Sequence, residues 1–196
     1  MGNSARPALI AVIGDAWLPE SDTRLELAEE CGKAVIEAGY YLVTGGLGGI
    51  MEAACRGAHQ AVKYRHGCVI GLLPGLNPAE ANPFVDIAIA TGLELGRNLI
   101  VANSSAIIAI GGGPGTLAEM ALGWQLGRLI VALNVDGWSG QLAGKALDKR
   151  RRRNKEVSND RIYGVTSASE AVELINELLP KYPYRFKGIK PHAIDE

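Results

Sequence analysis

The strongest chemical signal in the sequence is a glycine-rich segment that leads into a predicted helix. It reads Gly111-Gly112-Gly113-Pro114-Gly115-Thr116-Leu117-Ala118-Glu119. Glycines let the backbone approach a phosphate closely, and a helix that begins there points the positive end of its dipole at the anion. We therefore predict that Gly112, Gly113, Gly115 and Thr116 bind a phosphate group. The segment lacks the Gly-Lys-Ser/Thr ending of a Walker loop, so it does not indicate triphosphate hydrolysis.

The same segment has an interpretation that needs no ligand. Thr116 and Glu119 have the T-x-x-E spacing of a capping box, in which the two side chains satisfy the first N–H groups of a helix. Both interpretations can hold together, because a capping site at a helix N-terminus is also an anion site.

Two other glycine positions follow predicted strands. Thr44, Gly45 and Gly46 open a second glycine-rich loop before a helix, and we predict that they also contact phosphate. The alternative is a flexible loop without a ligand, and the G-x-G-x-x-G spacing of a dinucleotide fingerprint is absent. Gly14 ends the first predicted strand, where a small residue lets a ligand approach the backbone. A plain tight turn is equally consistent with Gly14.

Arg97 and Asn98 open a short predicted helix directly before a buried strand. A guanidinium is suited to bidentate phosphate binding, so Arg97 is a candidate for the site, with Asn98 beside it. A structural ion pair is the alternative role for Arg97.

The elements that must position these residues alternate between strands and helices. Apolar runs without period-two alternation indicate strands covered on both faces, as in a parallel sheet. The pattern therefore predicts an α/β fold, a single Rossmann-like doubly wound domain over residues 1–196 with a parallel sheet of about seven strands. Ligands then bind at the carboxyl ends of the strands. The expected strands are Ala8–Gly14, Tyr40–Val43, Val69–Leu73, Ile87–Ala90, Ala106–Ile110, Leu129–Leu133 and Ile162–Val165.

Capping signals give the expected helix boundaries. Ser21 is the expected N-cap of the first helix and Gly39 its stop. A further helix is expected to begin near Gly140 and to end in the basic run 149–155, whose other interpretation is a phosphate or RNA patch. The tail 181–196 is expected to pack loosely or to reach a neighbour. The expected helices are about Asp22–Ala38, Ile50–Tyr64, Arg97–Asn103, Thr116–Leu126 and Ser169–Leu179.

Composition excludes several classes of protein. The net charge of -1 argues against non-specific nucleic-acid binding, and no apolar run reaches the ~18 residues of a membrane span. The N-terminus lacks the apolar segment of a signal peptide. The three cysteines, Cys31, Cys55 and Cys68, form no CxxC motif, so we expect buried, reduced thiols in a cytoplasmic protein and no metal site.

Taken together and in this order, the loops resemble those of the LONELY GUY and "lysine decarboxylase-like" families of the SLOG superfamily, over roughly residues 9–179. The signature P-G-G-x-G-T-x-x-E matches residues 111–119, except that Gly111 replaces the proline. The cytokinin-activating members are phosphoribohydrolases of nucleoside 5′-monophosphates. Their functional arginine and glutamate fall on Arg97 and Glu119, which the resemblance makes the catalytic candidates. The surrounding M-H-x-R-K motif is altered here, with Glu94, Leu95 and Asn98 in place of Met, His and Lys.

The altered motif looks closer to the branch of molybdenum cofactor carrier proteins, which bind a phosphorylated pterin without turning it over. The leading hypothesis is therefore a binding protein for a phosphorylated pterin or nucleotide, and the alternative is a nucleoside 5′-monophosphate phosphoribohydrolase. No cofactor is required in either case, and the bound ligand would be a nucleoside monophosphate or a molybdopterin-type molecule. The expected partner is this phosphorylated small molecule, with no nucleic acid and no membrane. The resemblance also implies a homodimer or homotetramer, and Trp124 is either an interface residue or a core aromatic.

Overall fold

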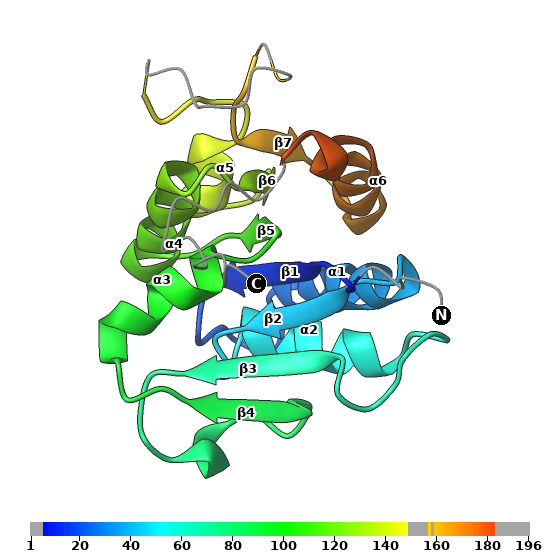
Figure 1. The fold of residues 1–196 in the computed structure, drawn as a ribbon, viewed down its shortest axis with the longest axis vertical. Coiled ribbons are helices and arrows are strands. Elements are labelled where there is room, and N and C mark those ends of the chain that lie inside the picture. Colours follow the sequence, from blue (N-terminus) through cyan, green and yellow to red (C-terminus); the bar gives the residue numbers. More distant parts are fainter. Residues whose placement is uncertain (1–5, 149–156, 158, 183–196) are drawn as a thin grey trace, which may run out of the picture.

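A computed structural model describes residues 6–148, 157 and 159–182, which form one α/β domain (Figure 1). The strands are β1 (Leu9–Gly14), β2 (Tyr41–Thr44), β3 (Val69–Leu73), β4 (Ile87–Ala90), β5 (Ala106–Ile110), β6 (Leu129–Leu133) and β7 (Tyr163–Val165). The helices are α1 (Thr23–Glu37), α2 (Ile50–His59), α3 (Arg97–Ala102), α4 (Pro114–Gln125), α5 (Trp138–Leu142) and α6 (Ala168–Leu178). Short 3-10 turns are η1 (Pro78–Glu80), η2 (Glu94–Gly96) and η3 (Leu179–Lys181).

The strands of the described chain form one parallel sheet in the order β4-β3-β2-β1-β5-β6-β7. The central strands β5 and β6 are buried at every residue, which explains their continuous apolar sequences. The order reverses between β1 and β5, and such a switch point opens a crevice at the carboxyl ends of the strands. The predicted fold class is therefore confirmed.

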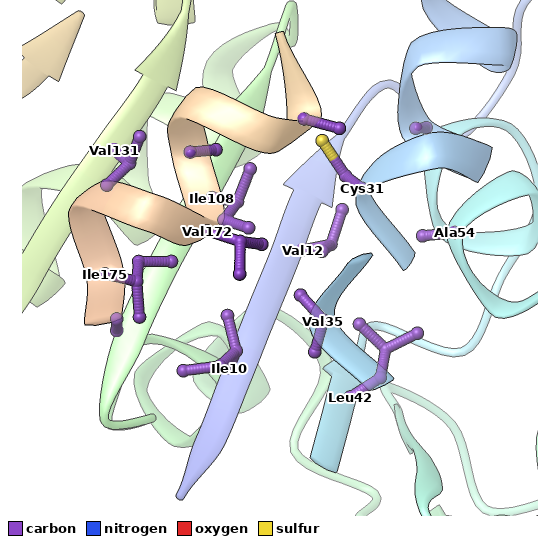
Figure 2. Packing of buried hydrophobic residues seen from close by; sticks show 14 of the residues in the cluster. Ile10, Val12, Cys31, Val35, Leu42, Ala54, Ile108, Val131, Val172 and Ile175 are labelled. Carbon is purple, nitrogen blue, oxygen red and sulfur yellow. The ribbon is translucent and has the colours of Figure 1, made fainter. Parts of the chain in front are cut away.

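Helices cover the sheet in two layers (Figure 1). The apolar side chains of α1, α2 and α6 share one core cluster with one face of the sheet, and those of α3 and α4 share a second cluster with the other face. Figure 2 shows Val172 and Ile175 of α6 next to Ile10 of β1 and Ile108 of β5 in the first cluster. Helices therefore cover both faces of the central strands, and the carboxyl edge of the sheet is where a ligand could reach them.

The α1 and α2 helices pack closely, because each has a glycine at the contact. A Cβ at Gly32 would overlap the backbone of Ala54, and one at Gly57 would overlap the backbone of Glu29. The expected thiols are confirmed, since Cys31, Cys55 and Cys68 are buried and free. Burial raises the pKa of Cys31 to about 12 and that of Cys55 to about 11, so these thiols are unreactive.

Several expected boundaries are wrong. The N-cap of α1 is Asp22 and not Ser21, because the Asp22 side chain accepts a hydrogen bond from the Arg24 N–H. The helix expected from Gly140 into the basic run begins at Trp138 and ends at Leu142. Ala143 leaves the helical conformation with a ψ of 128°, and Gly144 follows with a φ of 77°. The basic run 149–155 and most of the tail lie outside the described residues.

Trp124 is a core aromatic and not an interface residue, because it is only 5% exposed and packs in the same cluster as Ile107 and Met120.

Candidate ligand-binding site

The loop after β5 is held in shape by its glycines and by hydrogen bonds from its neighbours. Gly112 has a φ of 91°, and a Cβ there would overlap the side chain of Thr116. The Gly111 N–H donates to Ser139 Oγ at 2.7 Å, and that hydroxyl donates in turn to the Leu133 carbonyl. The Gly112 N–H donates to Asp15 Oδ2 at 2.8 Å. Gly112 therefore shapes the loop, and its N–H is already used by the protein.

The glycines that follow are open to a ligand. A Cβ at Gly113 or Gly115 would meet no atom within 4 Å. The first intrahelical hydrogen bond of α4 runs from the Leu117 N–H to the Gly113 carbonyl, so the N–H groups of Gly115 and Thr116 precede the helical ladder. These N–H groups and the dipole of a 12-residue helix have the arrangement that binds anions at helix N-termini, and the phosphate site here remains a prediction.

The capping-box interpretation is wrong. The α4 helix begins at Pro114, its N-cap is Gly113, and no side chain caps it. Thr116 therefore lies inside the first turn, where it is 3% exposed, and Glu119 lies a turn further along the helix. With no capping role, the acidic side chain of Glu119 needs another explanation.

The loop after β2 lies beside α3. Thr44 is fully buried, and its hydroxyl accepts a hydrogen bond from the Gly46 N–H at 3.1 Å. Asn82 donates from its side chain to the carbonyls of Gly46 and Leu47, and these bonds help to fix the loop. A Cβ at Gly45 would overlap the guanidinium of Arg97 and the sulfur of Met51, so a side chain there would displace them. The second glycine loop and Arg97 therefore lie in contact.

Arg97 and Glu119 face each other across the contact between α3 and α4. Arg97 Nη1 lies 3.6 Å from Glu119 Oε1, and the side chains are 10% and 9% exposed. The distance exceeds that of a hydrogen bond, and Arg97 Nε is buried without a hydrogen-bond partner. A buried guanidinium with unused donors is costly in a closed protein and is suited to an incoming acceptor.

Burial sets the charge of this pair. Desolvation raises the pKa of Glu119 to about 7, against the opposing effect of Arg97. Desolvation also lowers the pKa of Arg97, with Glu119 raising it. Glu119 therefore changes its protonation near neutral pH and can either donate or accept a proton there. Asn98 is buried next to Arg97 on α3.

A second pair of charged side chains, Asp15 and Arg24, connects the loops at the carboxyl ends of β1 and β5. Asp15 Oδ2 accepts from Arg24 Nη1 at 3.1 Å as well as from the Gly112 N–H. Arg24 also donates to the Asp136 carbonyl, so this network ties together the loops after β1, β5 and β6. The neighbouring Gly14 has no room for a side chain, because a Cβ there would lie 2.5 Å from the Ile110 carbonyl and 2.7 Å from Ile50. Packing alone therefore explains Gly14.

Sequence reasoning did not include Asp15, Asn82 and Ser139 among the site residues. Asp15 directly follows Gly14 and could have been found from its place at the carboxyl end of a strand. Asn82 lies in a loop without a motif, and its partners are 35 and 36 residues away, so the sequence holds no signal for it.

One cavity of the described residues lies away from this site. It measures about 730 Å³ and is lined by residues of β7 and α6, among them Tyr163 and Glu170, but by none of the predicted site residues. Three glutamates of α6 line it, Glu170, Glu173 and Glu177. Arg161 lines it too, but the acidic excess disfavours a phosphate. In the described residues no group of three His, Cys, Asp or Glu side chains could hold a metal ion, and no helix there is long and apolar enough to cross a membrane.

Comparison with known proteins relates these features to a family. Residues 7–172 match the SLOG cluster4 family. The molybdenum cofactor binding protein of the phototrophic bacterium Rippkaea orientalis has a similar structure, with a TM-score of 0.72 and 33% identity over 90% of this chain and 99% of that one. The molybdenum cofactor carrier protein of Chlamydomonas reinhardtii gives a TM-score of 0.69 and 29% identity over 89% and 99%. An uncharacterized protein of Archaeoglobus fulgidus is 39% identical over 125 residues, which are 63% of this chain and 78% of that protein.

Proposed function

Because the chain belongs to the SLOG cluster4 family, we propose that it binds a phosphorylated pterin of the molybdenum cofactor type and carries it without chemical change. Two solved relatives of almost the same length are described as binding or carrying this cofactor. The resemblance seen in the sequence pointed to the same branch. The proposed compartment is the cytoplasm, where free thiols such as those found here stay reduced.

The observation that carries the proposal is the buried, incompletely paired guanidinium of Arg97 beside two glycine loops. Arg97 Nε has no partner, and the nearest carboxylate oxygen of Glu119 is 3.6 Å from Nη1. The N–H groups at the start of α4 lie at open positions. In the proposed complex, Gly113, Gly115 and Thr116 hold the phosphate through their backbone, and Arg97 donates to it or to the pterin.

The exposed side chain of Trp17 lies where it could contact the pterin ring of such a ligand. Trp17 follows Asp15 in the loop after β1 and is 78% exposed, which is unusual for so large an aromatic side chain. Its backbone lies against Gly49 at the start of α2, so it belongs to the rim of the second glycine loop. An exposed indole there can stack on a planar ring such as a pterin.

Native mass spectrometry of the purified protein tests the proposal. The wild type, made in a host that synthesises molybdopterin, is expected to release a phosphorylated pterin on dissociation. Arg97→Gln is expected to retain much less of it. A wild type that carries no phosphorylated ligand, and takes up none when mixed with molybdopterin, would contradict the carrier role.

The second candidate is hydrolysis of the N-glycosidic bond of a nucleoside 5′-monophosphate. The specific observation in its favour is the carboxyl of Glu119, buried beside Arg97 with its pKa raised to about 7. In such a reaction the carboxylate would stabilise the cation-like sugar or orient the attacking water, and Arg97 would hold the phosphate or polarise the leaving base. Release of free base from nucleoside monophosphates, lost in Glu119→Gln, would favour this candidate over the carrier.

A further inference from the structure

The buried charges of the candidate site compensate each other only in part. Arg97 Nη1 and Glu119 Oε1 are 3.6 Å apart, and both side chains are almost completely buried. This distance is too long for a hydrogen bond, and Arg97 Nε is buried without a partner. The guanidinium therefore keeps donors for an incoming anion, while the carboxyl has little to offset the loss of its hydration.

Arg97 is the charged side chain that the elements around α4 bring to Glu119. The α4 helix packs against α3, α5, β1, β5 and β6. Arg97 is the only ionisable residue of these elements, and Glu119 is the only one of α4 itself. The glycine loop 44–49 beside Arg97 has none, and Asp15 in the loop after β1 is paired with Arg24. Within the described residues, the charge of the Glu119 carboxylate is therefore balanced by Arg97.

An anionic ligand that accepts from Arg97 changes this balance. The guanidinium then compensates the charge of the ligand, and the ligand itself repels a neighbouring carboxylate. An ionised Glu119 would be left buried, without its cation, beside a further negative charge. Such a charge is costly, and a carboxyl avoids the cost by binding a proton. Ligand binding at Arg97 and protonation of Glu119 therefore favour each other.

We propose that the site binds its phosphorylated ligand together with one proton, which the carboxyl of Glu119 holds. The inference rests on the proposed function, because it needs a phosphorylated ligand that accepts from Arg97. The proton turns Glu119 from a competing acceptor into a donor. The site then presents the guanidinium, the carboxyl O–H and the N–H groups at the start of α4. Glu119 thus determines specificity, since a site made of donors selects a ligand rich in acceptors, such as a phosphate ester.

The burial of Glu119 sets the pH range in which the coupling acts. In the protein without ligand, desolvation raises the pKa of this carboxyl to about 7. Below that pH the carboxyl already holds its proton, so ligand binding takes up none. Above it the proton must come from the solvent, and the affinity falls by up to about tenfold per pH unit while Glu119 stays protonated in the complex. The ligand is therefore held more tightly at the acidic side of neutral pH.

Titration calorimetry with molybdopterin at pH 8 measures the proton directly. The heat of binding differs between Tris and HEPES buffers in proportion to the protons that the complex takes up. The wild type is expected to take up about 0.9 proton per chain, the ionised fraction of a group whose pKa is about 7. Phosphate monoesters are already almost fully ionised at this pH, so the ligand contributes little. Glu119→Gln is expected to take up no proton.

The pH profile of the dissociation constant is a second readout. Between pH 7 and pH 9 the dissociation constant of the wild type is expected to rise at least about 10-fold, whereas that of Glu119→Gln stays level. Glu20→Gln is the matched control, because Glu20 is exposed and lies outside the site, and it is expected to keep the wild-type profile. A Glu119→Gln protein with the wild-type profile would overturn the proposal, since the proton would then be held elsewhere.

The outcomes separate this inference from the proposed function. A wild type that binds molybdopterin without taking up a proton overturns the proton coupling and leaves the carrier role intact. A wild type that binds no molybdopterin contradicts the carrier role. The same titration with inorganic sulfate, which does not change its charge in this pH range, then tests the coupling. Sulfate that does not bind, or that binds without proton uptake, overturns the coupling as well.

Discussion

Replacing Glu119 with glutamine is expected to change the stability of the protein in a pH-dependent way. The carboxyl is 7% exposed, and desolvation raises its pKa from 4.5 to about 7. In the unfolded chain the same group titrates near 4.5, so between these values the native state binds more protons. Wild-type stability therefore falls as pH rises from 4.5 to 7 and is constant again above the folded pKa.

The size of this effect follows from the pKa. Ionising the buried carboxyl costs the native state up to about 3 kcal/mol relative to the unfolded chain. Glutamine resembles the protonated acid and does not ionise. The free energy of unfolding of Glu119→Gln, minus that of the wild type, is therefore expected to grow by about 2 kcal/mol between pH 5 and pH 8.

Urea unfolding of both proteins at several pH values measures this difference. Glu20→Gln is the control, because Glu20 is exposed and makes no hydrogen bond or ion pair with another described residue. Its difference from the wild type is expected to stay constant. If the Glu119→Gln difference were as flat with pH as that of Glu20→Gln, the carboxyl would have an ordinary pKa. The electrostatic description of the site would then be wrong.

Three other substitutions follow from the structure. Gly115→Val is expected to change the free energy of unfolding by less than about 1 kcal/mol, because its Cβ meets open space, and to weaken ligand binding strongly. Gly112→Ala is expected to lose at least about 2 kcal/mol in thermal or urea unfolding, because alanine at a φ of 91° is strained and its Cβ overlaps Thr116. Asp22→Ala is expected to lose about 1 kcal/mol by removing the cap of α1, whereas Ser21→Ala, one residue earlier, is expected to lose almost none. Equal losses for Asp22→Ala and Ser21→Ala would show that the N-cap is wrongly assigned.

The strands were predictable because burial on both faces produces continuous apolar runs. β5 and β6 have the predicted bounds. β4 has them too, but one face of it is exposed at Ile87 and Ile89. The sequence could not show this, because an apolar run looks the same whether or not a helix covers it. The start of α4 was missed although Pro114 is a common first residue of a helix.

The candidate site was predictable only in part. The glycine loops could be placed at one edge, since the carboxyl ends of parallel strands meet there. The pairing of Arg97 with Glu119 came from the resemblance to known families and lies in the structure at 3.6 Å. The contacts of Asp15 and Asn82 depend on loops 97 and about 35 residues away, and only the folded chain brings these together.

Titration of the protein with molybdopterin tests the central claim most directly. The wild type is expected to bind one molecule per chain, and Gly115→Val is expected to bind at least 100-fold more weakly while its unfolding curve stays the same. The loss of affinity would then come from a side chain that occupies the proposed phosphate position at residue 115, and not from unfolding of the protein. Equal affinity of the wild type and Gly115→Val, or no binding by a folded wild type, would contradict the assignment of the site.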